Sequence, residues 1–150
     1  MKRFAIASDH AGFALKEALK AKFADKIDFL DLGVEEEARV DYPDYGYKLG
    51  QAIQDGEAAR GIVICGSGIG ISIAANRFPS VRAALCMTPE MAKLARQHND
   101  ANVLALGQRL VDEDTAFEIV EAFLNTEFEG GRHAGRVEKL SDVIPAKAGI

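Results

Sequence analysis

The stretch GIVICGSGIGISIAANR, residues 61–77, joins a short apolar run to closely spaced glycines and then to a helical pattern. The run from Gly61 to Cys65 is rich in β-branched residues and bounded by glycines, which is typical of a buried strand. Glycine then occupies every second position from 66 to 70, and the apolar spacing from there to Arg77 suits a helix. The stretch therefore predicts a strand, a tight turn and a helix in direct succession.

Such a turn presents several backbone N–H groups at the start of a helix, where the dipole favours anions. Cys65 ends the strand beside this turn and Ser67 lies within it, so a thiol and a hydroxyl flank a possible anion site. The spacing of these glycines excludes two common phosphate-binding motifs. Ile71 occupies the position of the last glycine in a dinucleotide-binding fingerprint, and Ile71-Ser72 stands where a P-loop has Lys-Ser/Thr. The alternative is that the glycines serve only the backbone conformation of the turn.

The composition is that of an ordinary globular protein. The chain has 150 residues, of which 48% are hydrophobic and 27% charged, and its net charge is −5 at pH 7. This charge argues against a nucleic-acid-binding or membrane-surface protein, so an anionic ligand needs a local group of cations. The two cysteines lack CxxC spacing, which predicts neither a disulfide framework nor a zinc site. No apolar stretch has the length of a signal peptide or a membrane span, and we expect a cytoplasmic protein.

Short apolar runs alternate with amphipathic segments along the chain. In the first amphipathic segment, Leu15, Leu19 and Phe23 form the apolar face and Lys16 and Lys20 lie on the opposite, polar face. Strands that alternate with helices predict an α/β fold, with a parallel sheet covered on both faces. We expect one domain over residues 1–150, with a loose tail at 145–150. The expected strands are residues 4–7, 27–32, 61–65, 81–86 and 103–106, and the expected helices are 11–24, 44–56, 70–77, 88–98, 112–124 and 132–143.

Ligands of parallel sheets bind at the carboxyl ends of the strands, where polar residues of this chain gather. Asp9 and His10 follow the first strand, Cys65 to Gly70 follow the third, and Arg109 follows the fifth, while His98, Asn99 and Tyr42 lie at helix ends or in loops. Each has a structural alternative. Asp9 suits a helix cap, His10 an exposed loop, Cys65 an inert core thiol like Cys86, His98 a cation at a helix C-terminus, and Arg109 an ion pair with Glu113.

Arg132 and Arg136 are spaced i, i+4 and lie on one face of the last expected helix. Two like charges at this spacing repel each other, and a bound phosphate would relieve the repulsion. The alternative is a solvated face with Glu129 nearby. His133 lies elsewhere on the same helix, and we expect it to be structural.

Five segments of the chain resemble the type B ribose-5-phosphate isomerases, the family shared with the bacterial galactose-6-phosphate isomerase subunits. They occur in the family's order over nearly the whole chain. The resemblance implies a Rossmann-like α/β/α sandwich and an aldose–ketose isomerase of sugar phosphates without cofactor or metal. It also implies a homodimer or dimer of dimers with active sites at the subunit interface. The segments are ASDHAGFALK, DYPDY, ICGSGIGISIAANR, RQHNDANVLALGQR and EGGRHAGRV.

The resemblance assigns a role to each candidate residue. Cys65 is expected to be the base that moves a proton between C1 and C2, and Ser67, where many relatives have Thr, to assist proton transfer at the oxygens. His98 is expected to open the furanose ring with the help of Asp9. Ile71 occupies the position that one branch fills with a glutamate base, which places this chain in the cysteine branch. The amides of Gly66, Gly68, Ile69 and Gly70 would stabilise the enediolate, His10, Arg109, Arg132 and Arg136 would hold the phosphate, and Asn99 and Tyr42 would contact the sugar.

The resulting hypothesis is the reversible interconversion of D-ribose 5-phosphate, a phosphorylated pentose, and D-ribulose 5-phosphate. The nearest alternative is the same chemistry on a six-carbon substrate, allose or galactose 6-phosphate. A non-catalytic phosphosugar or nucleotide sensor is an alternative from another class. A nicotinamide-dependent reductase is disfavoured by the glycine register.

Overall fold

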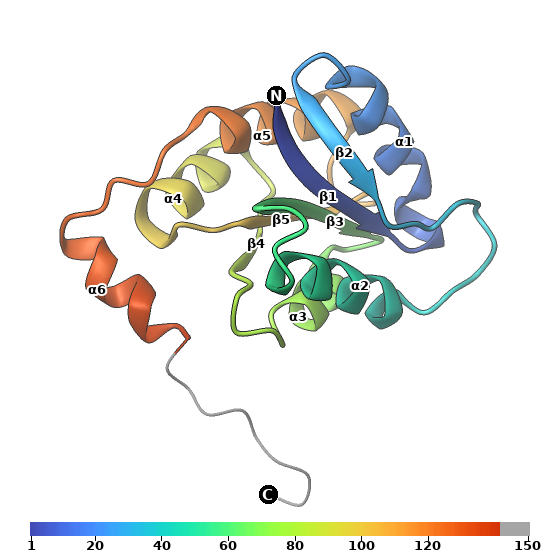
Figure 1. The fold of residues 1–150 in the computed structure, drawn as a ribbon. Helices are drawn as coiled ribbons and strands as arrows, with labels where there is room; N and C mark the ends of the chain where they lie inside the picture. The colour runs from blue at the N-terminus through green and yellow to red at the C-terminus, as the bar shows by residue number, and fades with distance from the viewer. Residues whose placement is uncertain (142–150) are drawn as a thin grey trace, which may run out of the picture.

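Five parallel strands form the centre of the molecule, as expected from the alternating pattern (Figure 1). The structure is a computed structural model and describes residues 1–141. The strand order is β2-β1-β3-β5-β4, so the third strand, which contains Cys65, lies in the middle of the sheet. The strands are β1 (Lys2–Ser8), β2 (Ile27–Asp31), β3 (Arg60–Cys65), β4 (Ala83–Leu85) and β5 (Val103–Gly107).

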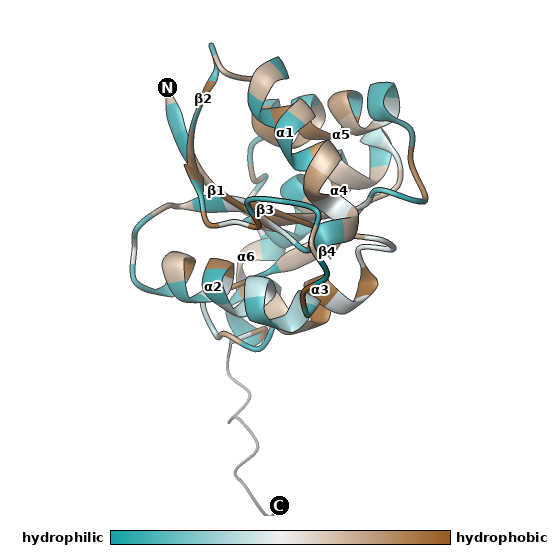
Figure 2. Ribbon diagram, turned by 90° about the vertical axis from the view of Figure 1, so that its right-hand side faces the viewer, coloured by the Kyte–Doolittle hydropathy of each residue, from teal (hydrophilic) through white to brown (hydrophobic). Residues whose placement is uncertain are grey.

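Helices cover both faces of the sheet, which makes a three-layer α/β/α sandwich (Figure 2). Side chains alternate along β1, so that Phe4 and Ile6 pack under α1, α4 and α5, whereas Ala5 and Ala7 face α2 and α3. All four are fully buried, as central parallel strands require. The helices are α1 (Phe13–Lys22), α2 (Tyr42–Gln54), α3 (Ile69–Ala75), α4 (Pro89–Asn99), α5 (Glu113–Asn125) and α6 (Arg132–Lys139), and a 3₁₀ turn (His10–Gly12) precedes α1.

Several helix boundaries differ from the sequence expectation, and side-chain hydrogen bonds explain two of them. The first α-helix begins two residues late, because the Asp9 carboxylate accepts the Gly12 amide and caps a 3₁₀ turn instead. Helix α3 ends at Ala75 instead of Arg77, where the side chain of Asn76 exchanges two hydrogen bonds with the backbone of Ala83. Helix α2 begins two residues early, at Tyr42.

Two other elements, the fourth strand and the last helix, are shorter than expected. The strand expected over residues 81–86 is reduced to Ala83–Leu85, because β4 lies at the edge of the sheet and, among residues 1–141, pairs with β5 alone. The last helix ends at Lys139, and its expected end at Val143, like the tail at 145–150, lies outside the described residues. In the described part of the chain, no helix is both long and apolar enough to cross a bilayer.

Helix α6 stands apart from the sandwich and packs against α4 (Figure 1). The segment between α5 and α6 runs beside α4, where the Glu129 amide donates to the carbonyl of Gln97 at 3.1 Å. His133 is the buried residue of α6, and its other described residues are half-buried or exposed. A helix with so little buried surface gains little stability from packing against the rest of its own chain.

One expectation about α1 is wrong, because Lys16 does not lie on a solvated face. Its side chain is only 1% exposed, and its Nζ contacts carboxylate oxygens of Glu17 and Asp31, each at 2.8 Å. Lys20 Nζ lies 2.7 Å from the same oxygen of Asp31. Burial alone would raise the pKa of Asp31, but hydrogen bonds from the two ammonium groups outweigh it and lower that pKa below its ordinary value. This network ties β2 to α1.

Asp31→Asn should lower the free energy of unfolding at pH 7 by about 1–3 kcal/mol, because a buried ammonium loses a charged partner. The folded-state pKa of Asp31 is depressed, so its stabilisation is complete above the unfolded pKa and is lost as the pH falls through the folded one. The difference in unfolding free energy between variant and wild type, measured by urea unfolding, should therefore shrink as the pH falls below about 4 and through the lowered folded-state pKa. Asp28→Asn, which removes an exposed ion pair with Arg3, is the matched control. An equal loss in both variants would contradict this assignment.

Candidate active site

The glycine-rich turn after β3 wraps closely around the thiol of Cys65. The Gly68 amide donates to Cys65 Sγ at 3.2 Å, and the Ile69 amide donates to Ser67 Oγ at the same distance. Gly68 has φ +77°, and a Cβ there would lie 2.8 Å from the carbonyl carbon of Leu106. Glycine is therefore required at this position, and without a side chain the turn can close onto the sulfur.

Asp9 and His10 face the same turn from the end of β1. Asp9 is 6% exposed, and one carboxylate oxygen accepts the Gly12 amide at 3.1 Å. The alternative of a helix cap is therefore confirmed, and the same residue also lines the pocket described below. His10 Nδ1 accepts the Val40 amide at 3.1 Å, so the neutral ring carries its proton on Nε2. His10 is thus oriented to donate a hydrogen bond to an anion.

Arg109 and Tyr42 close the site from two other elements. The amide of Arg109 donates to the carbonyl of Gly66 at 3.0 Å, and its guanidinium lies over that glycine, since a Cβ on Gly66 would come within 2.9 Å of it. Tyr42, at the start of α2, lies against Gly70 in the same way, at 2.5 Å from where a Cβ would be. Each of these glycines leaves room for a side chain that lines the same pocket.

These residues line one pocket of about 600 Å³ at the carboxyl edge of the sheet. The structure therefore brings together the predicted residues that follow β1, β3 and β5, and Tyr42 with them. Three apolar side chains also line this pocket and stay about half exposed, namely Ile69, Ile73 and Leu110. The predicted lining residues are Asp9, His10, Tyr42, Cys65, Gly66, Ser67, Ile69, Gly70 and Arg109, and Gly68 belongs to the same turn.

Four predicted site residues do not line this pocket. His98 and Asn99 form the last turn of α4, and Arg132 and Arg136 lie on α6. The end of α4 is held firmly, because the buried guanidinium of Arg96 bonds the Asp100 carboxylate at 3.0 Å and the carbonyls of Ala101 and Thr126. This chain therefore presents two separate groups of predicted site residues.

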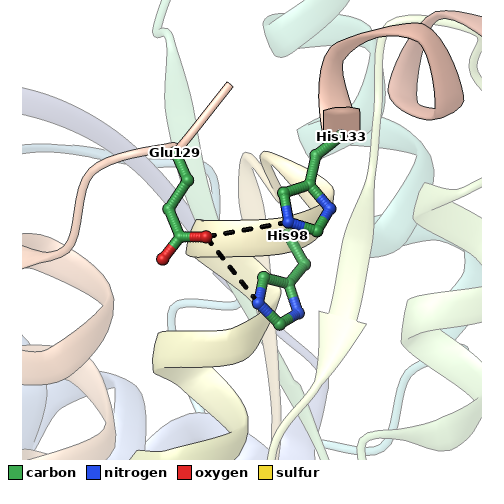
Figure 3. A group of neighbouring side chains, drawn as sticks. All are labelled: His98, Glu129 and His133. Atoms are coloured by element: carbon green, nitrogen blue, oxygen red, sulfur yellow. Dashed lines mark ion pairs between the residues drawn. The ribbon is translucent and has the colours of Figure 1, made fainter. Parts of the chain in front are cut away.

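His133, which we expected to be structural, lies beside His98 (Figure 3). The two ring centroids are 4.5 Å apart with the planes inclined by 15°, and Glu129 Oε1 lies 3.9 Å from His98 Nε2 and 3.7 Å from His133 Nε2. Their potential ligand atoms all lie within 4.8 Å of one another. In the sequence, the i, i+4 spacing of Glu129 and His133 was the signal that could have placed these two residues together.

The two cysteines have different surroundings. Cys65 lines the pocket, whereas Cys86 is 1% exposed and belongs to the core beneath α4 and α5. Burial raises the pKa of the Cys86 thiol to about 11, so it stays protonated at neutral pH. The expectation that Cys86 is an inert core residue is therefore confirmed.

Known proteins resemble this chain over nearly its full length. A family model described as ribose/galactose isomerase matches residues 4–140. Ribose-5-phosphate isomerase B of Escherichia coli (strain K12) is 45% identical over 144 residues, which cover 95% of this chain and 97% of that protein.

Solved structures agree with the sequence relatives. A ribose 5-phosphate isomerase from Thermotoga maritima has a TM-score of 0.92 and 52% identity over 95% of this chain and 99% of its own. A ribose-5-phosphate isomerase B from Clostridium thermocellum has a TM-score of 0.90 and 50% identity over 93% and 95%. The chain therefore belongs to the ribose/galactose isomerase family of sugar-phosphate isomerases.

Proposed function

We propose that this enzyme interconverts D-ribose 5-phosphate and D-ribulose 5-phosphate through an enediolate, with Cys65 as the base. The observation that carries the proposal is the placement of Cys65 Sγ in the pocket, held by the Gly68 amide and flanked by Asp9, His10 and Arg109. A thiolate there meets both needs of the reaction, a fixed base and a nearby anchor for phosphate. The names of the similar proteins support this choice of substrate.

In the proposed reaction, the Cys65 thiolate removes the proton from C2 of the open-chain aldose and returns it to C1. A positioned base of this kind contributes roughly 10²–10⁴ in rate. The backbone amides of the turn from Gly66 to Gly70 would stabilise the enediolate oxygens, where one donor can be worth about 10²–10³. Ser67 would carry the proton between the two oxygens.

We propose that His10 and Arg109, which line the same pocket, bind the phosphate group of the substrate. Because His10 Nδ1 accepts the Val40 amide, the neutral ring carries its proton on Nε2, which would donate to the phosphate. Arg109 adds a positive charge and a planar set of donors, which suits a phosphate group. Tyr42 would contact the sugar. The net charge of −5 is compatible with an anionic substrate because these donors converge locally.

We further propose that a partner subunit completes each pocket with His98, Asn99, Arg132 and Arg136. In this chain those residues lie on α4 and α6, away from its own pocket. Half-exposed apolar side chains occur both at the pocket, such as Ile73, and on α4, where Met91 and Leu94 lie one turn apart. Exposed apolar surface of this kind marks protein interfaces, and a two-fold dimer would bring the pocket of one subunit to α4 and α6 of the other.

Cys65→Ala should lower kcat on ribose 5-phosphate by at least about 10²-fold, while the variant stays folded and binds a phosphosugar analogue. The assay follows ribulose 5-phosphate formation with EDTA present, and Cys86→Ala is the matched control that should retain activity. Retained turnover in Cys65→Ala would remove Cys65 as the base. A wild type active only on six-carbon phosphates would correct the substrate and keep the chemistry.

Iodoacetamide at about pH 8 should modify Cys65 and leave Cys86 unmodified, because the thiolate is the reactive form and Cys86 has a pKa of about 11. Ribose 5-phosphate should slow the modification of Cys65, which lines the proposed substrate pocket. Mass spectrometry of the digested protein distinguishes the two sites. Equal labelling of both cysteines, or no protection by substrate, would contradict the proposed site.

Mixed dimers test where His98 acts. Cys65→Ala and His98→Asn subunits, co-expressed with different tags and purified as the mixed species, should regain about half of wild-type activity, because one of the two shared sites is intact. Each parent dimer should be inactive on cyclic ribose 5-phosphate. Mixed dimers as inactive as their parents would place Cys65 and His98 in the site of one subunit.

A further inference from the structure

Three chain segments meet at the end of α4, where they place His133 against His98 (Figure 3). The Glu129 amide donates to the Gln97 carbonyl at 3.1 Å, which holds the segment before α6 beside α4. The next two residues, both glycine, take φ values of +66° and +55° where the chain turns into α6. The backbone thus returns His133 to the residue that we assign to ring opening.

The two imidazole rings touch by their faces. Their centroids are 4.5 Å apart and their planes are inclined by 15°, which agrees with offset-stacked aromatic pairs at about 4.5–7 Å. Glu129 Oε1 lies 3.9 Å from His98 Nε2 and 3.7 Å from His133 Nε2, beyond hydrogen-bond range. Because the ring planes are nearly parallel, their nitrogens do not converge on one point. The contact between the two histidines is therefore a stack.

His133 is the fixed member of this pair. Its side chain is 8% exposed, whereas that of His98 is 39% exposed. His133 Nε2 has neither solvent contact nor a hydrogen-bond partner among residues 1–141, so packing holds the ring. Desolvation, followed by repulsion from Arg132 and from protonated His98, lowers the pKa of His133 against the opposing charge of Glu129. At neutral pH the His133 ring is therefore uncharged, and His98 can gain or lose a proton beside it without facing a second charged ring.

We propose that His133 is a positioning residue for His98, because its buried ring fixes the orientation of the half-exposed imidazole that opens the furanose. This inference rests on the proposed function, in which His98 has that role. Opening the ring breaks the C1–O4 bond, forms the C1 carbonyl and moves one proton from the C1 hydroxyl to O4. A histidine that accepts the first proton or delivers the second must hold a nitrogen against one oxygen, and a misplacement of about 1 Å can cost about 10²-fold in rate.

Stacking suits this task, because it covers a face of the His98 ring and leaves the nitrogens at the ring edge uncovered. The competing role of His133 is to anchor α6, which carries Arg132 and Arg136. Loss of an anchor would weaken phosphate binding and so affect every substrate. Loss of a positioning residue for His98 would affect only a substrate that must open its ring. Ribulose 5-phosphate has no furanose form, because its C5 hydroxyl carries the phosphate.

The test therefore compares two reactions of each variant. One is the formation of ribulose 5-phosphate from ribose 5-phosphate, which includes ring opening. The other is deuterium incorporation at C1 of ribulose 5-phosphate in D₂O, which needs the base and no ring opening. His133→Gln, which keeps a polar side chain without a ring, should lower kcat of the first reaction by about 10–10²-fold and leave the exchange rate unchanged.

Three further variants identify the cause of that loss. His133→Phe keeps a flat ring and loses both nitrogens, so it should retain most of the turnover of ribose 5-phosphate. Arg136→Ala, a phosphate-binding variant on the same helix, should raise KM in both reactions. Cys65→Ala should lose both reactions. Circular dichroism verifies that each variant is folded.

Nuclear magnetic resonance follows the stack without substrate. The chain has three histidines, so variants assign the ring protons of His98 directly. In the wild type, we expect Overhauser contacts between the rings of His98 and His133. The His98 ring protons, which the stacked ring shields, should move downfield in His133→Gln and stay near the wild-type position in His133→Phe.

An equal loss of both reactions in His133→Gln would make His133 an anchor of α6 only and overturn the proposal. No loss in either reaction, or a His133→Phe variant as slow as His133→Gln, would overturn it as well. If neither variant folds, the Overhauser contacts of the wild type decide, and their absence excludes the stack. A wild type inactive in both reactions would instead overturn the proposed function, and the resonances of His98 alone would then decide whether His133 orients it.

Discussion

The register of three parallel strands is the constraint on which the pocket depends. Ser8 pairs with Ile64 and Cys65 with Gly107, so β1, β3 and β5 end at one level. Backbone hydrogen bonds continue past these ends, from the Asp9 amide to the Ile64 carbonyl at 3.2 Å and from the Gln108 amide to the Cys65 carbonyl at 3.0 Å. A shift of one residue in any strand would turn its side chains to the other face and move the base away from its neighbours.

Local pattern was sufficient to predict the fold and to predict that residues following β1, β3 and β5 line one pocket. Strand and helix periods are properties of short segments, and the rule that polar residues at strand ends share one edge placed Asp9, Cys65 and Arg109 together before any contact was known. The boundaries were less predictable. Helix α3 stops where Asn76 meets the backbone of Ala83, a contact between segments that the sequence does not reveal.

What periodicity could not predict depends on how distant segments pack. Lys16 lies on the polar side of α1 by spacing, yet its side chain is buried because Asp31 of β2 approaches from outside the helix. In the same way, the helical period placed Arg132 and Arg136 on one face and left His133 on another, whose neighbour is α4. The turn at Gly130 and Gly131 determines that meeting, and two glycines permit many such turns.

The two groups of predicted residues explain why α6 is built as it is. A helix of eight residues that buries one side chain against its own chain is poorly stabilised by that packing. Its two arginines also repel each other unless an anion lies between them. In the proposed dimer, a partner subunit would bring its phosphate-binding pocket to this helix and so supply both the apolar cover and the negative charge that α6 lacks. In that dimer, substrate binding and the placement of α6 therefore support one another.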